Sequence, residues 1–174
     1  MDAQIPAINF IFREDGEFVT RSSAQLFGGK RVVIFSLPGA FTPTCSAYQL
    51  PGFEDNYDVI TASGIDEIYC ISVNDAFVMN AWAKDQGIEK VKLIPDGNGE
   101  FTREMGMLVS KTNIGFGNRS WRYAAVINDG VIEWLSAEPG QRSNADDDPY
   151  VRSTPEEVMT YLYEHPTKFK IPVA

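Results

Sequence analysis

Cys45 is the residue whose type and position most directly suggest chemistry. It follows a buried apolar run (31–37) and a proline-containing turn (38–43), and it lies in the first turn of a predicted helix. The unpaired backbone N–H groups and the positive dipole end of a helix favour a thiolate, the nucleophilic form of cysteine. Thr42, three residues earlier, offers a hydroxyl to the sulfur or to a bound oxygen. Position alone supports a nucleophile and a small buried hydrophobic residue equally well.

Two cationic residues, Arg119 and Arg122, are candidates for activating this thiol. They lie between a glycine-rich stretch and a predicted strand. A guanidinium beside a thiolate stabilises the negative charge and can donate a hydrogen bond to a polar substrate atom. The same spacing fits two solvated arginines at the end of a loop, so the pattern leaves both interpretations open.

Other common chemistries find no support in the sequence. The second cysteine, Cys70, has apolar neighbours on both sides, which predicts a core residue, and the two cysteines form no CxxC pair. The single histidine, His165, cannot build a multi-histidine metal site and is expected to end a helix. Phosphotyrosine hydrolysis would require an arginine at position 51, where Pro51 stands. We therefore expect no metal and no cofactor.

Composition predicts one soluble globular domain over residues 1–174. The chain is 44% hydrophobic and 22% charged, and its net charge is −9. This acidity argues against nucleic-acid binding, which needs clustered Lys and Arg. Its apolar runs are too short to span a membrane, and its first residues lack the basic and apolar regions of a secretory signal. Because both thiols suit a reducing compartment, we expect a cytoplasmic protein.

Alternating strand and helix patterns must position Cys45 and its neighbours. The expected strands cover 31–37, 67–73, 92–96, 122–129 and 131–136, after an N-terminal hairpin at 8–20. The expected helices cover 44–63, 76–86, 100–107 and a last segment starting with Thr154 as its N-cap, Pro155 at its first position and Glu157 completing a capping box. Residues 113–121 are predicted to be a loop, and the acidic 141–149 a mobile one.

This order of elements predicts an α/β protein with a central mixed sheet. A thioredoxin-like three-layer sandwich with an N-terminal hairpin is the most economical match. The order by itself does not separate this fold from other three-layer sandwiches.

Several segments resemble the type-5 branch of the peroxiredoxins, which includes bacterial forms fused to glutaredoxin. The similar segments are SLPGAFTPTCS, SVNDAFVMNAW, LIPDGNGEFT, MGMLV and GFGNRSWRY, which span most of the chain from Arg31 to Tyr123. The pattern Pro38, Thr42, Cys45 is the most specific of these. The resemblance implies a thiol peroxidase that reduces hydrogen peroxide and organic hydroperoxides.

The resemblance also implies a role for each residue of the motif. Cys45 matches the peroxidatic cysteine, Thr42 the threonine that orients the peroxide, and Arg122, in preference to Arg119, the arginine that stabilises negative charge. Pro38 and Gly39 would shield the peroxide pocket. The backbone N–H groups of Thr44 and Cys45 would complete the cradle.

Two departures from the family pattern shape the expected reaction cycle. Gln49 stands where many relatives carry a histidine, so a hydrogen-bonding group replaces a titratable one. The region 138–150 lacks the late resolving cysteine of animal type-5 members. The resemblance therefore implies a one-cysteine enzyme recycled by an external thiol, with glutathione and glutaredoxin favoured over thioredoxin. Alternatives are a peroxide sensor acting on a partner protein and a cycle through a Cys45–Cys70 disulfide.

The resemblance further implies a homodimer packed through the active-site edge. The loop carrying Phe41 and the residues around Phe77 are the candidates for this contact.

Overall fold

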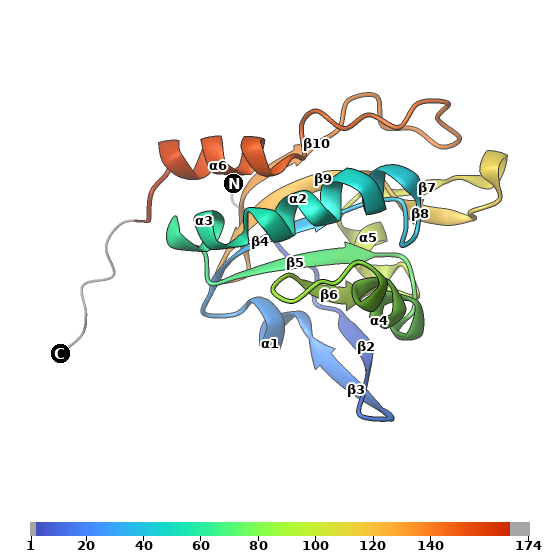
Figure 1. The fold of residues 1–174 in the computed structure, drawn as a ribbon, viewed down its shortest axis with the longest axis horizontal. Coiled ribbons are helices and arrows are strands. Elements are labelled where there is room, and N and C mark those ends of the chain that lie inside the picture. The colour runs from blue at the N-terminus through green and yellow to red at the C-terminus, as the bar shows by residue number, and fades with distance from the viewer. Residues whose placement is uncertain (1–2, 168–174) are drawn as a thin grey trace.

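A six-stranded mixed sheet forms the centre of the molecule (Figure 1). The structure is a computed structural model and describes residues 3–167. The strand order is β1-β10-β9-β4-β5-β6. The strands span Ala3–Gln4 (β1), Arg31–Ser36 (β4), Glu67–Ser72 (β5), Lys92–Pro95 (β6), Tyr123–Asn128 (β9) and Val131–Ala137 (β10). β4, β5 and β6 are parallel, whereas β9 is antiparallel to both β4 and β10.

The two central strands are buried on both faces, as their apolar runs predict. Every residue of β4 and β5 is buried. Successive side chains of β4 enter opposite cores: Val33 and Phe35 contribute to one, Val32 and Ile34 to the other. Burial on both faces explains why these strands are apolar between their first and last residues rather than alternating. The predicted strands over 31–37 and 67–73 are confirmed to within a residue.

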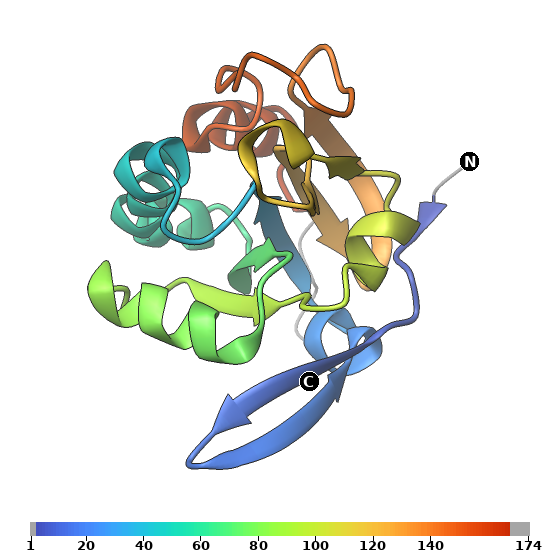
Figure 2. The same cartoon turned by 90° about the vertical axis from the view of Figure 1, so that its right-hand side faces the viewer.

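Helices and a hairpin cover the two faces and give three layers, which confirms the predicted sandwich. One core is closed by α2 (Leu50–Asp55), α3 (Tyr57–Ala62), α4 (Ala76–Asp85) and α6 (Pro155–Glu164). The other is closed by the predicted hairpin, β2 (Asn9–Glu14) and β3 (Glu17–Ser22), with α1 (Ser23–Phe27), α5 (Glu100–Glu104) and β7 (Leu108–Ser110). Figure 2 shows the hairpin extending beyond the rest of the molecule.

The prediction of one regular helix over 44–63 is wrong. The helical run opens with a π-helical turn, η1 (Cys45–Gln49), in which the Leu50 N–H donates to the Cys45 carbonyl five residues back. Pro51 explains the wider turn, because it has no N–H to donate and its ring crowds the carbonyl four residues earlier. A second break, at Asn56, separates α2 from α3. The expected glycine stop is confirmed, since Gly64 has φ +92°.

The prediction of a loop over 113–121 is also wrong in part. Its end forms β8 (Asn118–Ser120), which pairs with β7 after a single 3-10 turn, η2 (Thr112–Ile114). The predicted N-cap Thr154 accepts from the Glu157 N–H at 3.2 Å, and Pro155 is the first residue of α6. His165 ends α6, as expected, and its ring stacks on Tyr161.

Candidate active site

Cys45 is fully buried at the carboxyl end of β4, where the sheet meets the first helical turn. The first helical hydrogen bond of this run joins the Ser46 N–H to the Thr42 carbonyl at 2.9 Å. The N–H groups of Thr44 and Cys45 precede that bond, so they belong to the unpaired donors of a helix start. The predicted setting of the thiol, after a buried strand and inside the first turn, is thus present.

Arg122 is the cation that faces the sulfur. Its Nη1 donates to Cys45 Sγ at 3.3 Å, and its side chain is 2% exposed. Strand register explains the encounter, because Tyr123 pairs with Ser36 and brings the start of β9 beside the end of β4. Burial disfavours the guanidinium charge, but the nearby Cys45 and Asp148 outweigh this effect and raise the pKa of Arg122. The cation is therefore held in place inside the protein.

Gln49 extends this contact on the helix side. It is fully buried in the π-helical turn, and its Oε1 accepts from Arg122 Nη1 at 2.5 Å. A guanidinium has only donors, which fixes the amide with its oxygen toward Arg122. The amide thus holds the arginine without titrating, as its residue type predicts.

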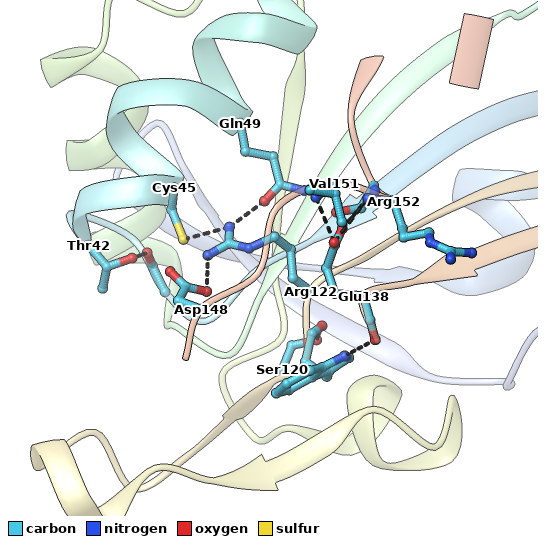
Figure 3. A network of polar contacts seen from close by, with 12 residues as sticks. Thr42, Cys45, Gln49, Ser120, Arg122, Glu138, Asp148, Val151 and Arg152 are labelled. Atoms are coloured by element: carbon cyan, nitrogen blue, oxygen red, sulfur yellow. Dashed lines mark hydrogen bonds and ion pairs between the residues drawn. The ribbon is translucent and has the colours of Figure 1, made fainter. Parts of the chain in front are cut away.

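Asp148 completes the set of contacts around the guanidinium and is a residue that sequence reasoning missed. Its Oδ1 accepts from Arg122 Nη2 at 2.6 Å (Figure 3). The acidic stretch 146–148 is predicted to be solvated loop, and Asp148 is indeed 44% exposed at its side chain. Its partner lies 26 residues away in the chain, so no local pattern signals the pair.

Arg119 lies near the site but has a different set of contacts. Its Nη1 donates to the Pro38 carbonyl at 3.1 Å and its Nε to the Phe116 carbonyl at 3.2 Å. A side chain on Gly39 would overlap Arg119 Nη1, so this close approach requires glycine. Burial lowers the pKa of Arg119, and the nearby Cys45 opposes that effect. Of the two candidate arginines, only Arg122 hydrogen-bonds the sulfur.

Thr42 closes the turn before the helix. Its hydroxyl donates to the Gly39 carbonyl at 2.7 Å, and its side chain is half-buried. The preceding residue, Phe41, has φ +63° and is 53% exposed, so its aromatic ring faces solvent. The expected contact between the Thr42 hydroxyl and the sulfur is not among the hydrogen bonds of the described residues.

Cys70 behaves as a core residue. It is fully buried on β5, where it pairs with Phe35 of β4. Burial raises the pKa of the Cys70 thiol well above its usual value, and the nearby Cys45 adds to this effect. A buried, protonated thiol is a poor nucleophile.

Within residues 3–167, no cluster of three or more His, Cys, Asp or Glu side chains could hold a metal ion. No helix in this part of the chain is long and apolar enough to cross a membrane.

A thioredoxin-like sandwich whose buried thiol meets a buried guanidinium defines a thiol-dependent redox protein. Comparison with known proteins makes the class specific. The family described as Redoxin matches residues 2–149. A Rhizobium etli peroxiredoxin is 54% identical over 171 residues, covering 93% of this chain and 96% of the relative. A Haemophilus influenzae hybrid peroxiredoxin, hyPrx5, is 45% identical over 91% of this chain and 64% of its own length.

Solved structures agree with the sequence comparison. A Plasmodium falciparum antioxidant protein, described as a 1-Cys peroxiredoxin, superposes with a TM-score of 0.89 at 37% identity, covering 94% of this chain and 98% of that one. The reduced Prx3 of Vibrio vulnificus in complex with H2O2 has a TM-score of 0.82 at 37% identity, covering 92% of this chain and 96% of that one. The chain belongs to the peroxiredoxins, a family of thiol peroxidases.

Proposed function

We propose that this peroxiredoxin reduces hydrogen peroxide and organic hydroperoxides with Cys45 as the sole reacting cysteine. The observation that carries the proposal is the 3.3 Å hydrogen bond from Arg122 Nη1 to Cys45 Sγ, made between two buried side chains. The cation stabilises the thiolate and the negative charge that develops on the peroxide. The superposition with a peroxiredoxin bound to H2O2 supports the same substrate class.

In the first half of the cycle, the Cys45 thiolate attacks one peroxide oxygen. An S–O bond forms, the O–O bond breaks, and the leaving oxygen takes a proton to become water or an alcohol. The sulfur is oxidised to a sulfenic acid while the peroxide is reduced by two electrons. We assign charge stabilisation to Arg122 and to the N–H groups of Thr44 and Cys45.

The turn before the helix supplies the remaining groups. The Thr42 oxygen, whose proton is donated to Gly39, keeps lone pairs that can accept from a peroxide O–H. Pro38 and Gly39 form the wall of the pocket, and the Arg119 hydrogen bond to the Pro38 carbonyl holds that wall.

In the second half, an external thiol attacks the sulfenic sulfur, an S–S bond forms and water leaves. A second thiol then reduces the mixed disulfide and restores Cys45. The chain has only two cysteines, and Arg122 hydrogen-bonds Cys45, whereas burial raises the pKa of the Cys70 thiol; these observations support an external reductant. Glutathione with glutaredoxin is our preferred reductant, which the similarity to a hybrid peroxiredoxin supports, and thioredoxin is the alternative.

Turnover assays test this cycle. We expect steady peroxide consumption with glutathione and glutaredoxin, slower turnover with thioredoxin, and no turnover in C45S. The matched control is C70A, which removes the other sulfur and should retain activity. Peroxide consumption by C45S at the wild-type rate would refute the assignment.

A peroxide sensor is the second candidate, motivated by the lack of a late resolving cysteine and by the position of Cys70 in the core strand β5. A sensor would be oxidised once and then form a mixed disulfide with a partner protein. Sustained turnover with small thiols would exclude a sensor without peroxidase activity.

We also propose that the protein is a cytoplasmic homodimer. Phe41 and Phe77 are 53% and 57% exposed, and burying such rings against a second copy would remove apolar surface from water. Sedimentation should show a dimer that F41D and F77D convert to a monomer. Both cysteines are free, which suits a reducing compartment.

A further inference from the structure

Residues 139–153 lie between β10 and α6 (Figure 1), and Figure 3 shows one of them, Asp148, beside Arg122 and Cys45. We refer to residues 139–153 as the strap. One of its side chains, Asp148, reaches inward to Arg122 Nη2 at 2.6 Å. The pair is unequal, since the Arg122 side chain is 2% exposed and that of Asp148 is 44% exposed. The strap therefore places a partly exposed carboxylate in contact with the buried guanidinium of Arg122.

The two ends of the guanidinium have different partners. Nη1 donates to Cys45 Sγ and to Gln49, whereas Nη2 donates to Asp148 (Figure 3). Nε is buried without a partner among the described residues. Because a guanidinium is planar and rigid, fixing Nη2 also fixes the direction in which Nη1 points. Asp148 and Gln49 thus set the orientation of the donor that faces the sulfur.

Glu138 connects the strap to Arg122, the residue that precedes β9. Its buried carboxylate accepts from the N–H groups of Val151, Arg152 and Ser153 at 2.7 to 2.9 Å, and from the Ser153 hydroxyl at 2.6 Å. The Glu138 N–H donates to the Arg122 carbonyl at 3.0 Å. This one residue joins the strap to the main chain that carries the arginine.

We propose that Asp148 is a positioning residue for peroxide reduction, and that Glu138 holds the strap so that Asp148 can act. This inference rests on the proposed role of Cys45. Asp148 aims Arg122 Nη1 at the sulfur and the incoming peroxide, but its negative charge also opposes the thiolate. Removing the charge should therefore have two opposite effects. The thiolate becomes easier to form, while the reaction with peroxide slows because the guanidinium loses its fixed orientation.

The test compares D148N with D147N. Asparagine removes the charge and offers Nη2 a neutral amide oxygen, so a weaker hydrogen bond replaces the charge-assisted one and holds the guanidinium less firmly. Asp147 is the matched control because it is the preceding residue on the strap and, within residues 3–167, pairs only with the exposed Arg142, at 2.9 Å. The measured quantities are the rate of Cys45 oxidation by H2O2 in a single turnover and the pH profile of Cys45 alkylation by iodoacetamide.

We expect D148N to slow oxidation about tenfold and to move the midpoint of the alkylation profile to lower pH. D147N should change the rate by less than about twofold and leave the midpoint in place. A purely structural role for Asp148 would lower stability without moving the midpoint, so an unmoved midpoint overturns the inference. Equal rates in D148N and D147N overturn it as well.

E138Q provides an independent variant that leaves the Arg122 side chain untouched. Glutamine has one oxygen acceptor, and its amide N–H2 faces the donor groups of residues 151–153, so some hydrogen bonds that hold the strap should be lost. We expect a similar slowing of oxidation, and wild-type kinetics in E138Q would refute the role of the strap. If wild-type Cys45 itself fails to react with peroxide, the proposed function fails. If it reacts but D148N behaves as D147N, only the positioning role fails.

Discussion

Replacing Arg122 with lysine separates charge from geometry at the active site. Arg122 contacts Cys45 and Gln49 through one nitrogen and Asp148 through another. Lysine keeps the positive charge but has a single nitrogen, so it cannot make both sets of contacts. Losing one charge-assisted hydrogen bond to the sulfur costs about 2 kcal/mol, which corresponds to a rate about 30-fold lower.

Replacing Arg122 with methionine removes the charge as well. At 3.3 Å and an effective dielectric constant of about 20, the attraction between a thiolate and a unit cation is about 5 kcal/mol. Delocalisation over the guanidinium and the opposing Asp148 carboxylate reduce this value. We therefore expect R122M to lose about 4 kcal/mol of transition-state stabilisation, a rate roughly 10³-fold lower.

The assay is stopped-flow measurement of single-turnover thiol oxidation by H2O2. R119K is the control, because Arg119 donates only to the Pro38 and Phe116 carbonyls among the described residues. Lysine can retain one of those bonds, so we expect a loss of about threefold. The reasoning is refuted if R122K reacts within threefold of wild type, or if R119K loses more than R122K.

Further predictions concern stability and the turn before Cys45. Burial acts to raise the pKa of Glu133, but hydrogen bonds from Arg31 and Tyr161 outweigh it and leave that pKa lowered. The contribution of Glu133 to folding stability is therefore present at neutral pH and is lost as the pH falls below about 4.5. E133Q should therefore unfold about 2 kcal/mol more easily at pH 7, with a smaller difference at pH 3 in urea titrations; equal differences would contradict this. C70A should lose about 1 to 2 kcal/mol in the same titrations, because it leaves a small cavity, while its peroxide rate is unchanged. G39A should displace Arg119 from the Pro38 carbonyl and lower the free energy of unfolding by about 1.5 kcal/mol. In an R119M background the same substitution should cost little. An equal cost in both backgrounds would show that the added methyl group clashes with a residue other than Arg119.

The central strands could be predicted because burial on both sheet faces requires a continuous apolar run, which the chain shows directly. The helix after Cys45 could be predicted only in outline. Pro51 was visible in the sequence, but whether it kinks, ends or widens a helix depends on packing, and here a π-helical turn accommodates it. That turn contains Gln49, whose contact with Arg122 no spacing rule indicates.

At the site, too, local features could be predicted from the sequence, whereas contacts between distant segments could not. Cys45 stands out from its local setting, whereas choosing Arg122 over Arg119 needed the family resemblance. The structural reason is the register that pairs Tyr123 with Ser36, a contact between strands far apart in the chain. Asp148 was hidden for a related reason: an exposed acidic stretch predicts solvation, and only the folded chain brings it to a buried cation.

Mapping the oxidised cysteine tests the central claim most directly. The protein is treated with one equivalent of H2O2 in the presence of dimedone, which traps sulfenic acids, and its peptides are analysed by mass spectrometry. We predict a single dimedone adduct on Cys45 and an unmodified Cys70. A Cys45–Cys70 disulfide, or an adduct on Cys70, would contradict a one-cysteine peroxidase.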